Sequence, residues 1–398
     1  MKVVTGSLLL ILLAFLGSYW SFARIKLPLA ARHFFLTGTE FIIVGFLLGP
    51  LAINLIDNNT MNDLQPLLTL ALGWTGFLFG LQIHLPLIRK FPPQYWKAGL
   101  LQASLVILLL LFPFYYLLET LTGSGQISQL CGAILLAATA SCTAQSSLAI
   151  FEKELHLTRN RLMEFLRFLS GVDATLAIII TGIMAFFSVR NPIFDVAVPT
   201  WIQWFLFVTV LSIVLAFLMD LLIQPNTKQS ELMVFIIGFV VFASGIAMYF
   251  NTSVLYMTTL MGAIIANCDS AKRIYAVLSI LEKPIYIVLL LLAGSMIPMI
   301  TFEMITLVFA YTLLRFIAKI SAGYTTSRYI KYPRNLPPFF GFGLISQGGI
   351  TVSLALAYRL VEPGMLSTIL LFTVLSAIII NEILAAVFMP RLLRVSDQ

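Results

Sequence analysis

One carboxylate stands alone in an apolar stretch of this sequence. Asp173 lies within LSGVDATLAIII, and the nearest other charge along the chain is Arg167, six residues before it. A carboxylate removed from water loses hydration, which favours its protonated form, whereas an opposite charge nearby favours its ionised form. Such a group can hold a proton at one moment and a small cation at the next. The alternative is a carboxylate that pairs with a basic residue only to fix helix packing.

Two basic residues within one apolar run could provide the opposite charge. Arg315 and Lys319 stand four residues apart in LLRFIAKISAGY, so on a helix they share one face. Lys319 lies near the end of its run and could instead extend its ammonium group to the membrane surface. Both roles stay open for Lys319. Glu382 and Glu40 are further acids inside apolar runs and are secondary candidates for the site.

The composition places these residues in a membrane protein. Of the 398 residues, 60% are hydrophobic and 10% are charged, and the mean hydropathy is +0.99. Soluble domains typically carry about 25% charged residues. Cys131, Cys142 and Cys268 show neither metal-ligand spacing nor a disulfide framework, and the three histidines lie far apart in the sequence. We therefore expect a protein that is not an enzyme and has no cofactor.

Apolar runs of roughly 20 residues, the length of a membrane-spanning helix, recur along the whole chain. They predict an all-α polytopic membrane protein of about 13 transmembrane helices, which forms a single transmembrane domain over residues 1–398. Its approximate halves are 34–187 and 231–390, joined by a linker helix at 201–223. The predicted spans are 5–22, 34–54, 64–86, 97–118, 127–151, 161–187, 201–223, 231–250, 253–268, 273–297, 300–323, 337–360 and 365–390.

Lysine and arginine residues gather on one side of these predicted spans. The loops after odd-numbered spans and the C-terminal tail hold 17 of them, whereas the opposite side holds 2. By the positive-inside rule, the N-terminus is outside and the C-terminus is cytoplasmic. The basic residues are scattered singly, so we expect membrane lipid and no nucleic acid as a partner. The compact chain favours a bacterial inner membrane.

Two of the predicted spans contain polar interruptions. The fifth includes LLAATASCTAQSSLAIFEKE and the twelfth includes GFGLISQGGITVSLALAYRL. Non-helical backbone at this depth is tolerated where it lines protein or a water cavity, and paired interrupted helices mark the ion sites of secondary transporters. Close packing of small residues against neighbouring helices is the alternative. The polar residues of these interruptions that are candidates for the site are Thr143, Gln145, Ser346 and Gln347.

The interruptions and the acids recur in the same order. Thr143 precedes Asp173 by 30 residues, and Gly349 precedes Glu382 by 33 residues. The second pair follows the first by seven predicted spans, and an odd offset inverts the second copy in the membrane. The pattern predicts inverted repeats whose two discontinuous helices cross near the middle of the bilayer.

Together, these motifs resemble the monovalent cation:proton antiporter superfamily, which includes the sodium/proton exchangers. VGFLLGP, residues 44–50, is similar to the glycine-proline signature in an early helix of that superfamily. ATASCTAQSSLAIFEKE and SQGGITVSLALA resemble its two unwound helices, and SGVDATLAIII resembles its ion-binding helix. LLRFIAKISAGY resembles the helix that supplies a basic residue near the acid. The resemblance covers nearly the whole chain.

The resemblance implies roles for individual residues. Asp173 takes the place of the ion-carrying carboxylate, and Thr143 that of the unwound-helix threonine. Lys319 takes the place of the basic residue, with Arg315 as the alternative. The resemblance also implies a homodimer, in which a core of broken helices moves like an elevator against a dimerisation scaffold.

We therefore expect a secondary antiporter that exchanges Na⁺ or K⁺ for H⁺, with Asp173 as the shared site. Thr143, Ser346 and backbone carbonyls could complete an oxygen shell around the cation. Val172 stands where the superfamily has asparagine or aspartate, and Ala144 where many sodium/proton exchangers have a second aspartate. These departures motivate a second hypothesis, a non-transporting membrane subunit or sensor with an unidentified regulatory partner. A third is an ion-coupled symporter of a small organic anion, which the N-termini of broken helices could hold.

Overall fold

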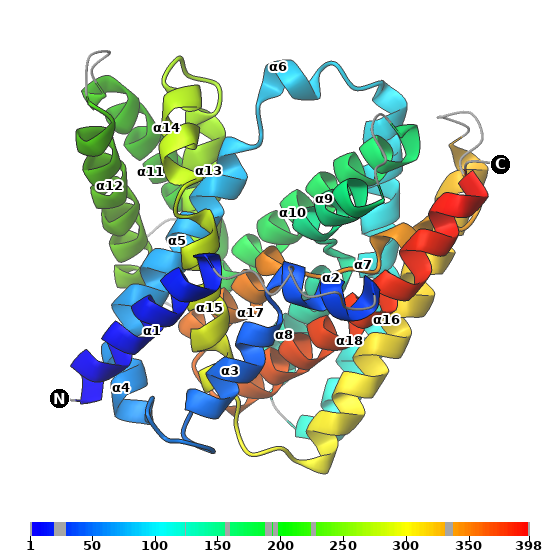
Figure 1. Ribbon diagram of the computed structural model, residues 1–398, viewed down its shortest axis with the longest axis horizontal. Coiled ribbons are helices and arrows are strands. Elements are labelled where there is room, and N and C mark those ends of the chain that lie inside the picture. Colours follow the sequence, from blue (N-terminus) through cyan, green and yellow to red (C-terminus); the bar gives the residue numbers. More distant parts are fainter. Residues whose placement is uncertain are drawn as a thin grey trace.

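The computed structural model describes residues 2–19, 29–123, 125–155, 160–187, 193, 198–223, 228–330 and 337–396, which form helices and no strand. The helices pack into two bundles that lie side by side in Figure 1. The N-terminus belongs to the first bundle and the C-terminus to the second (Figure 1). The chain therefore forms a bundle of helices at each side of a central seam.

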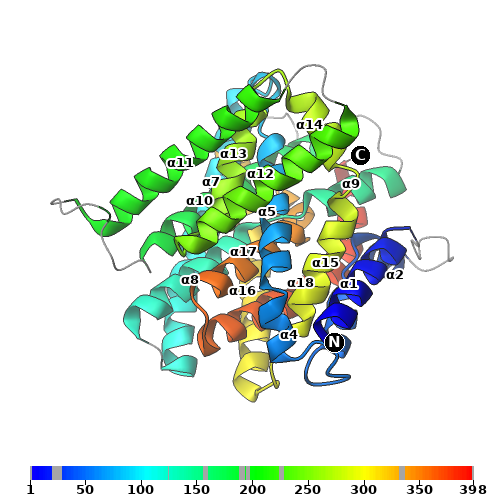
Figure 2. The same cartoon turned by 90° about the vertical axis from the view of Figure 1, so that its left-hand side faces the viewer.

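The first bundle contains the early helices and the middle third of the chain. Figure 2 shows it from its outer side, with α11 and α12 nearest the viewer. Its helices are α1 (Lys2–Tyr19), α3 (Glu40–Leu48), α4 (Asn58–Asp63), α5 (Gln65–Leu81), α11 (Thr200–Leu222), α12 (Gln229–Tyr249), α13 (Val254–Ile265), α14 (Ala271–Leu278) and α15 (Glu282–Ser295).

The second bundle contains both interrupted segments. Its helices are α7 (Pro93–Thr122), α8 (Gln126–Ser141), α9 (Gln145–Glu154), α10 (Arg161–Phe187), α16 (Phe302–Tyr329), the 3-10 helix η2 (Phe340–Leu344), α17 (Gly349–Val361) and α18 (Met365–Ser396). The short helix α2 (Leu29–Thr37) packs on α18 and α9 of this bundle. The short helix α6 (Leu85–Ile88) lies on the connection from α5 to α7 (Figure 1).

Each of the 13 predicted segments overlaps a helix or a pair of helices, so the all-helical membrane architecture is confirmed. Among the described residues, seven helical segments are long and apolar enough to cross a membrane, with α8 and α9 counted together as one, or eight if the bent pair α14–α15 counts as one more span. Four more apolar helices have only 10–17 residues. At 1.5 Å per residue, such helices are shorter than the roughly 30 Å of a bilayer core. The predicted count of 13 full spans is therefore confirmed only in part.

Two interruptions were not predicted. The second predicted span divides into α2 and α3 around Gly38, whose φ of +77° favours glycine. The tenth divides into α14 and α15, which meet at an angle of 55°. Neither region carries the mixture of hydroxyl and amide residues that indicated the other two breaks. The inverted orientation of the two halves and the placement of the termini across the membrane stay predictions.

Glycines hold the helices of the first bundle close together. A Cβ atom on Gly80 of α5 would lie 2.2 Å from the Thr259 carbonyl oxygen of α13, and one on Gly262 would lie 2.3 Å from the Phe77 carbonyl oxygen. In a membrane, small residues let helix backbones approach and so provide van der Waals contact in place of the hydrophobic effect. The first bundle is thus packed backbone to backbone along α5 and α13.

This packing predicts a position-dependent cost for adding one methyl group. Gly80→Ala should destabilise the folded protein by about 1–3 kcal/mol, because the backbone of α13 must move to make room. Gly238→Ala in α12 is the control, since nothing lies within 4 Å of its added Cβ. Thermal unfolding in detergent should show a lower melting temperature for Gly80→Ala only. Equal melting temperatures for the two variants would contradict the close packing.

Candidate ion-binding site

The two interrupted helices meet at their breaks. Residues 142–144 separate α8 from α9, and residues 345–348 separate η2 from α17. The backbone N–H of Ala144 donates to the Ser346 carbonyl oxygen at 3.1 Å, so the breaks run beside each other. Ala144 also packs on Gly348, where an added Cβ would lie 2.9 Å from the alanine Cβ. Small residues at both positions therefore allow the two chains to cross closely.

Asp173 is fully buried on α10 beside this crossing. Its Oδ2 accepts hydrogen bonds from Lys319 Nζ at 2.9 Å and from Thr143 Oγ1 at 3.2 Å. Its Oδ1 is also buried and has no hydrogen-bond partner within the described residues. A buried carboxylate is normally satisfied at both oxygens. The second oxygen is thus the part of this carboxylate that can accept a further ligand.

Lys319 is fully buried as well, so its ammonium group does not extend to the membrane surface. It donates to Asp173 Oδ2, to Thr143 Oγ1 at 2.9 Å and to the Ser141 carbonyl oxygen at the end of α8. The ammonium group therefore has three oxygen acceptors and forms an ion pair with Asp173. Lys319, rather than Arg315, is the direct partner of the carboxylate.

Arg315 lies one helical turn before Lys319 and is also fully buried. Its guanidinium group donates to backbone carbonyl oxygens of both breaks, which are those of Ala140, Cys142, Leu344, Ile345 and Ser346. The C-terminal end of a helix carries partial negative charge from carbonyls without helical partners. Arg315 therefore joins the C-terminal ends of α8 and η2 and holds the two breaks against each other.

The side chains of the second break face different neighbours. Gln347 donates to the Thr139 carbonyl oxygen and to the Tyr311 hydroxyl, both at 2.9 Å, and accepts from Asn381 at 2.8 Å. The Ser346 hydroxyl is buried and has no hydrogen-bond partner in the described part of the chain. Gln347 thus fixes the position of the break, whereas the Ser346 oxygen remains available to a ligand.

Glu382 lies on the opposite side of the crossing, in a cluster that the sequence did not indicate. Its Oε1 accepts from the Gln347 backbone N–H at 3.0 Å, and its Oε2 lies 2.9 Å from Nε2 of His33. The separation of the three histidines along the chain had suggested no site for any of them. The available signal was the position of His33 at the start of an apolar run, where a polar ring needs a partner.

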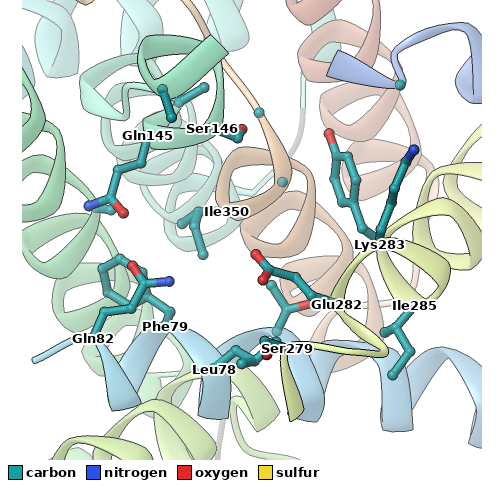
Figure 3. A pocket seen from close by; sticks show the side chains of 18 of the residues that line it. Leu78, Phe79, Gln82, Gln145, Ser146, Ser279, Glu282, Lys283, Ile285 and Ile350 are labelled. Carbon is teal, nitrogen blue, oxygen red and sulfur yellow. The ribbon is translucent and has the colours of Figure 1, made fainter. Parts of the chain in front are cut away.

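A cavity of about 1060 Å³ lies between the bundles and reaches the first break. Thr143 lines it from the second bundle and Glu40 from the first. Figure 3 shows Gln145 of the second bundle and Glu282 of the first at this cavity. Because Thr143 also contacts Asp173, one side chain connects the cavity to the buried carboxylate. Within the described residues, no three His, Cys, Asp or Glu side chains are grouped as metal ligands. Besides the Asp173 carboxylate, the oxygens that could bind a cation here are those of hydroxyl and carbonyl groups.

The residue before Asp173 packs against a neighbouring helix. Val172 is buried, and its Cβ would lie 3.0 Å from a Cβ added to Gly99 of α7. Its side chain therefore points toward α7, and a polar residue there would face a tight helix contact. This contact explains why an apolar residue precedes the carboxylate in this chain.

An all-helical membrane fold with a buried acid–base pair beside two crossing helix breaks defines the class of secondary transporters built on discontinuous helices. The family model described as "sodium/hydrogen exchanger, transmembrane" matches residues 11–394. The chain belongs to this family, and it is a transporter rather than an enzyme. The resemblance found in the sequence is therefore confirmed. No match was found among curated protein sequences.

The structure is similar to that of the sodium proton antiporter MjNhaP1 from Methanocaldococcus jannaschii at pH 8. The two share 14% sequence identity, and the similarity covers 97% of this chain and 100% of that chain with a TM-score of 0.66. At this identity, the similarity establishes the shared fold.

The bonds of Arg315 predict that it stabilises the crossing. Arg315→Met should leave several buried carbonyls without donors and lower the free energy of unfolding by roughly 3 kcal/mol. Arg328→Met on the same helix is the control, because Arg328 is exposed in the last turn of α16. In detergent, only Arg315→Met should lose about 5 °C or more in melting temperature. An unchanged melting temperature would show that these carbonyls do not depend on the guanidinium group.

Proposed function

We propose that this protein is a secondary antiporter that exchanges a monovalent cation, Na⁺ or K⁺, for H⁺ at Asp173. The observation that carries the proposal is the buried pair of Asp173 and Lys319, whose second carboxylate oxygen has no partner among the described residues. A pair of this kind can bind a cation only by releasing positive charge, because two cations cannot share one buried carboxylate at low dielectric.

The exchange follows from the geometry of the pair. A cation that binds Asp173 Oδ1 takes oxygen ligands from Thr143, the Ser346 hydroxyl and backbone carbonyls of the breaks. Lys319 then gives up one proton and becomes neutral, and the proton leaves through water in the cavity. When the cation dissociates, Lys319 takes up a proton and the ion pair re-forms. Each cation therefore replaces one proton, and the exchange is electroneutral.

Alternating access follows from the two bundles. The second bundle carries both breaks, and we propose that it moves like an elevator against the first bundle, which forms the homodimer contact. The glycine packing of α5 and α13 supports the first bundle as the rigid partner. Lys272, in the loop after the ninth predicted span, lines the cavity, and so does Arg167, near the start of the sixth predicted span. The cavity therefore opens toward the predicted cytoplasmic side of a bacterial inner membrane.

Na⁺ is the first cation to test, because the similar structure is that of a sodium proton antiporter. The organic-anion hypothesis gains no support from the basic residues of the site. Arg315 already donates to the carbonyls of both breaks, and Lys319 is bonded to Asp173. Neither basic side chain is therefore left to bind a substrate carboxylate.

Neutralising the carboxylate should abolish exchange. In proteoliposomes with an internal pH-sensitive dye, addition of Na⁺ or K⁺ should change the internal pH for the wild-type protein. Asp173→Asn should reduce the rate at least about 100-fold, because a neutral amide neither attracts a cation nor forms the ion pair that holds the proton on Lys319. Asp63→Asn, at an exposed carboxylate in α4, should leave the rate unchanged. Unchanged exchange by Asp173→Asn would refute the mechanism, and the absence of wild-type exchange with any monovalent cation would favour the sensor hypothesis.

A further inference from the structure

A second buried acid lies at the helix crossing, on the opposite side from Asp173. Glu382, His33 and Ser147, with the backbone N–H of Gln347, form what we call the Glu382 cluster. The Glu382 and His33 side chains are about 99% and 98% buried, from relative exposures of 1% and 2%. His33 also stacks on Phe151, with ring centroids 4.0 Å apart. The cluster joins four separate elements, which are α2, α9, the second break and α18.

Three donors converge on the Glu382 carboxylate. The Gln347 backbone N–H donates to Oε1 at 3.0 Å, and the Ser147 hydroxyl donates to Oε2 at 3.2 Å. His33 Nε2 lies 2.9 Å from Oε2 and 2.8 Å from Ser147 Oγ, whereas its Nδ1 is buried with no partner among the described residues. The tautomer that satisfies these contacts is neutral and carries its proton on Nε2. An ionised Glu382 is then the net charge of the cluster.

This negative charge lies where the broken helices are positive. Ser147 is in the first turn of α9, and Gln347 precedes α17 by two residues. The N-terminal end of a helix carries partial positive charge and favours an anion. Arg315 and Lys319 occupy the opposite ends, at the carbonyls of α8 and η2. At the crossing, the basic side chains therefore lie at the C-terminal ends of α8 and η2, and Glu382 lies at the N-terminal ends of α9 and α17.

We infer that Glu382, held by His33 and Ser147, is a positioning residue for cation exchange. It acts through the second break, because it binds the Gln347 N–H next to the Ser346 oxygen. It also offsets the positive charge of Arg315, which otherwise disfavours a cation at Asp173. This inference rests on the proposed function, because it concerns how tightly the Asp173 site binds its cation.

The charge of the Glu382 cluster gives the inference a direction. Without its negative charge, a cation at Asp173 faces Arg315 with less compensation. Tyr286 of α15 and Glu40 of α3 are further ionisable groups in this region, because Tyr286 interacts electrostatically with both Glu382 and Glu40. Both lie on the first bundle, and both line the cavity. Loss of the Glu382 charge should therefore weaken cation binding at Asp173.

The experiment measures cation-dependent thermal stabilisation of the full-length protein in detergent, titrated with NaCl or KCl at several pH values. A ligand that binds the folded state raises its melting temperature according to its concentration and affinity. Glu382→Gln keeps the shape of the side chain and removes its charge. It should raise the half-saturating cation concentration about fivefold to tenfold at alkaline pH. Glu303→Gln, at an exposed carboxylate in α16, is the charge control.

Two substitutions of His33 separate its donor role from packing. His33→Gln provides an amide N–H that can replace Nε2–H and should keep the wild-type half-saturating concentration at alkaline pH. His33→Leu provides no donor and should raise it. If Glu382→Gln binds the cation like the wild type, or if His33→Gln and His33→Leu behave alike, the inference is wrong. Glu382→Asp serves where Glu382→Gln does not fold, and it should bind between the wild type and His33→Leu.

Asp173→Asn distinguishes this inference from the proposed function. If Asp173→Asn removes the stabilisation but Glu382→Gln leaves its dependence on cation concentration unchanged, only the role of Glu382 fails. If the wild type shows no stabilisation that depends on Asp173, the proposed cation site fails, and the positioning role fails with it.

Discussion

Interrupting a helix inside a membrane leaves backbone carbonyl and amide groups that water does not reach, and each needs another partner. In this protein, Arg315 provides donors to the carbonyls of both breaks, and Lys319 provides one to the end of α8. The backbone carbonyls of the breaks therefore account for the positions of both positively charged side chains, without any bound ion. The remaining features of the crossing follow from it, because buried positive charge must itself be balanced.

Two carboxylates provide that balance, at different places and with different donors. Asp173 pairs directly with Lys319, whereas Glu382 accepts bonds from His33, Ser147 and the second break. With both acids ionised and His33 neutral, the charges of Asp173, Glu382, Arg315 and Lys319 cancel. A cation therefore enters the proposed site without leaving net buried charge only if a proton leaves. In this account, the coupling between the two ions is a consequence of charge balance around the breaks.

The sequence predicted the parts of the site whose signal is local. A lone acid in an apolar run indicated Asp173, and hydroxyl and amide residues within apolar spans indicated both breaks. The bond between His33 and Glu382 joins residues 349 positions apart, so no local pattern indicated it. The junction of α2 and α3 was missed for a different reason, because a single glycine at positive φ in an apolar run is also compatible with a continuous helix. Whether Lys319 reached the membrane surface depended on the neighbours of α16, which the sequence did not specify.

The junction at Gly38 connects the charge balance to movement between the bundles. The helix before it, α2, is fastened to the second bundle by His33, whereas α3 packs on α15 of the first bundle through Gly45 and Gly294. One short segment thus has its two ends fixed to different bundles. If the second bundle moves during exchange, either the bonds of His33 break in each cycle or the chain bends at Gly38. Bending is favoured, because breaking those bonds would leave an ionised Glu382 buried with fewer donors, whereas glycine tolerates a wide range of backbone angles.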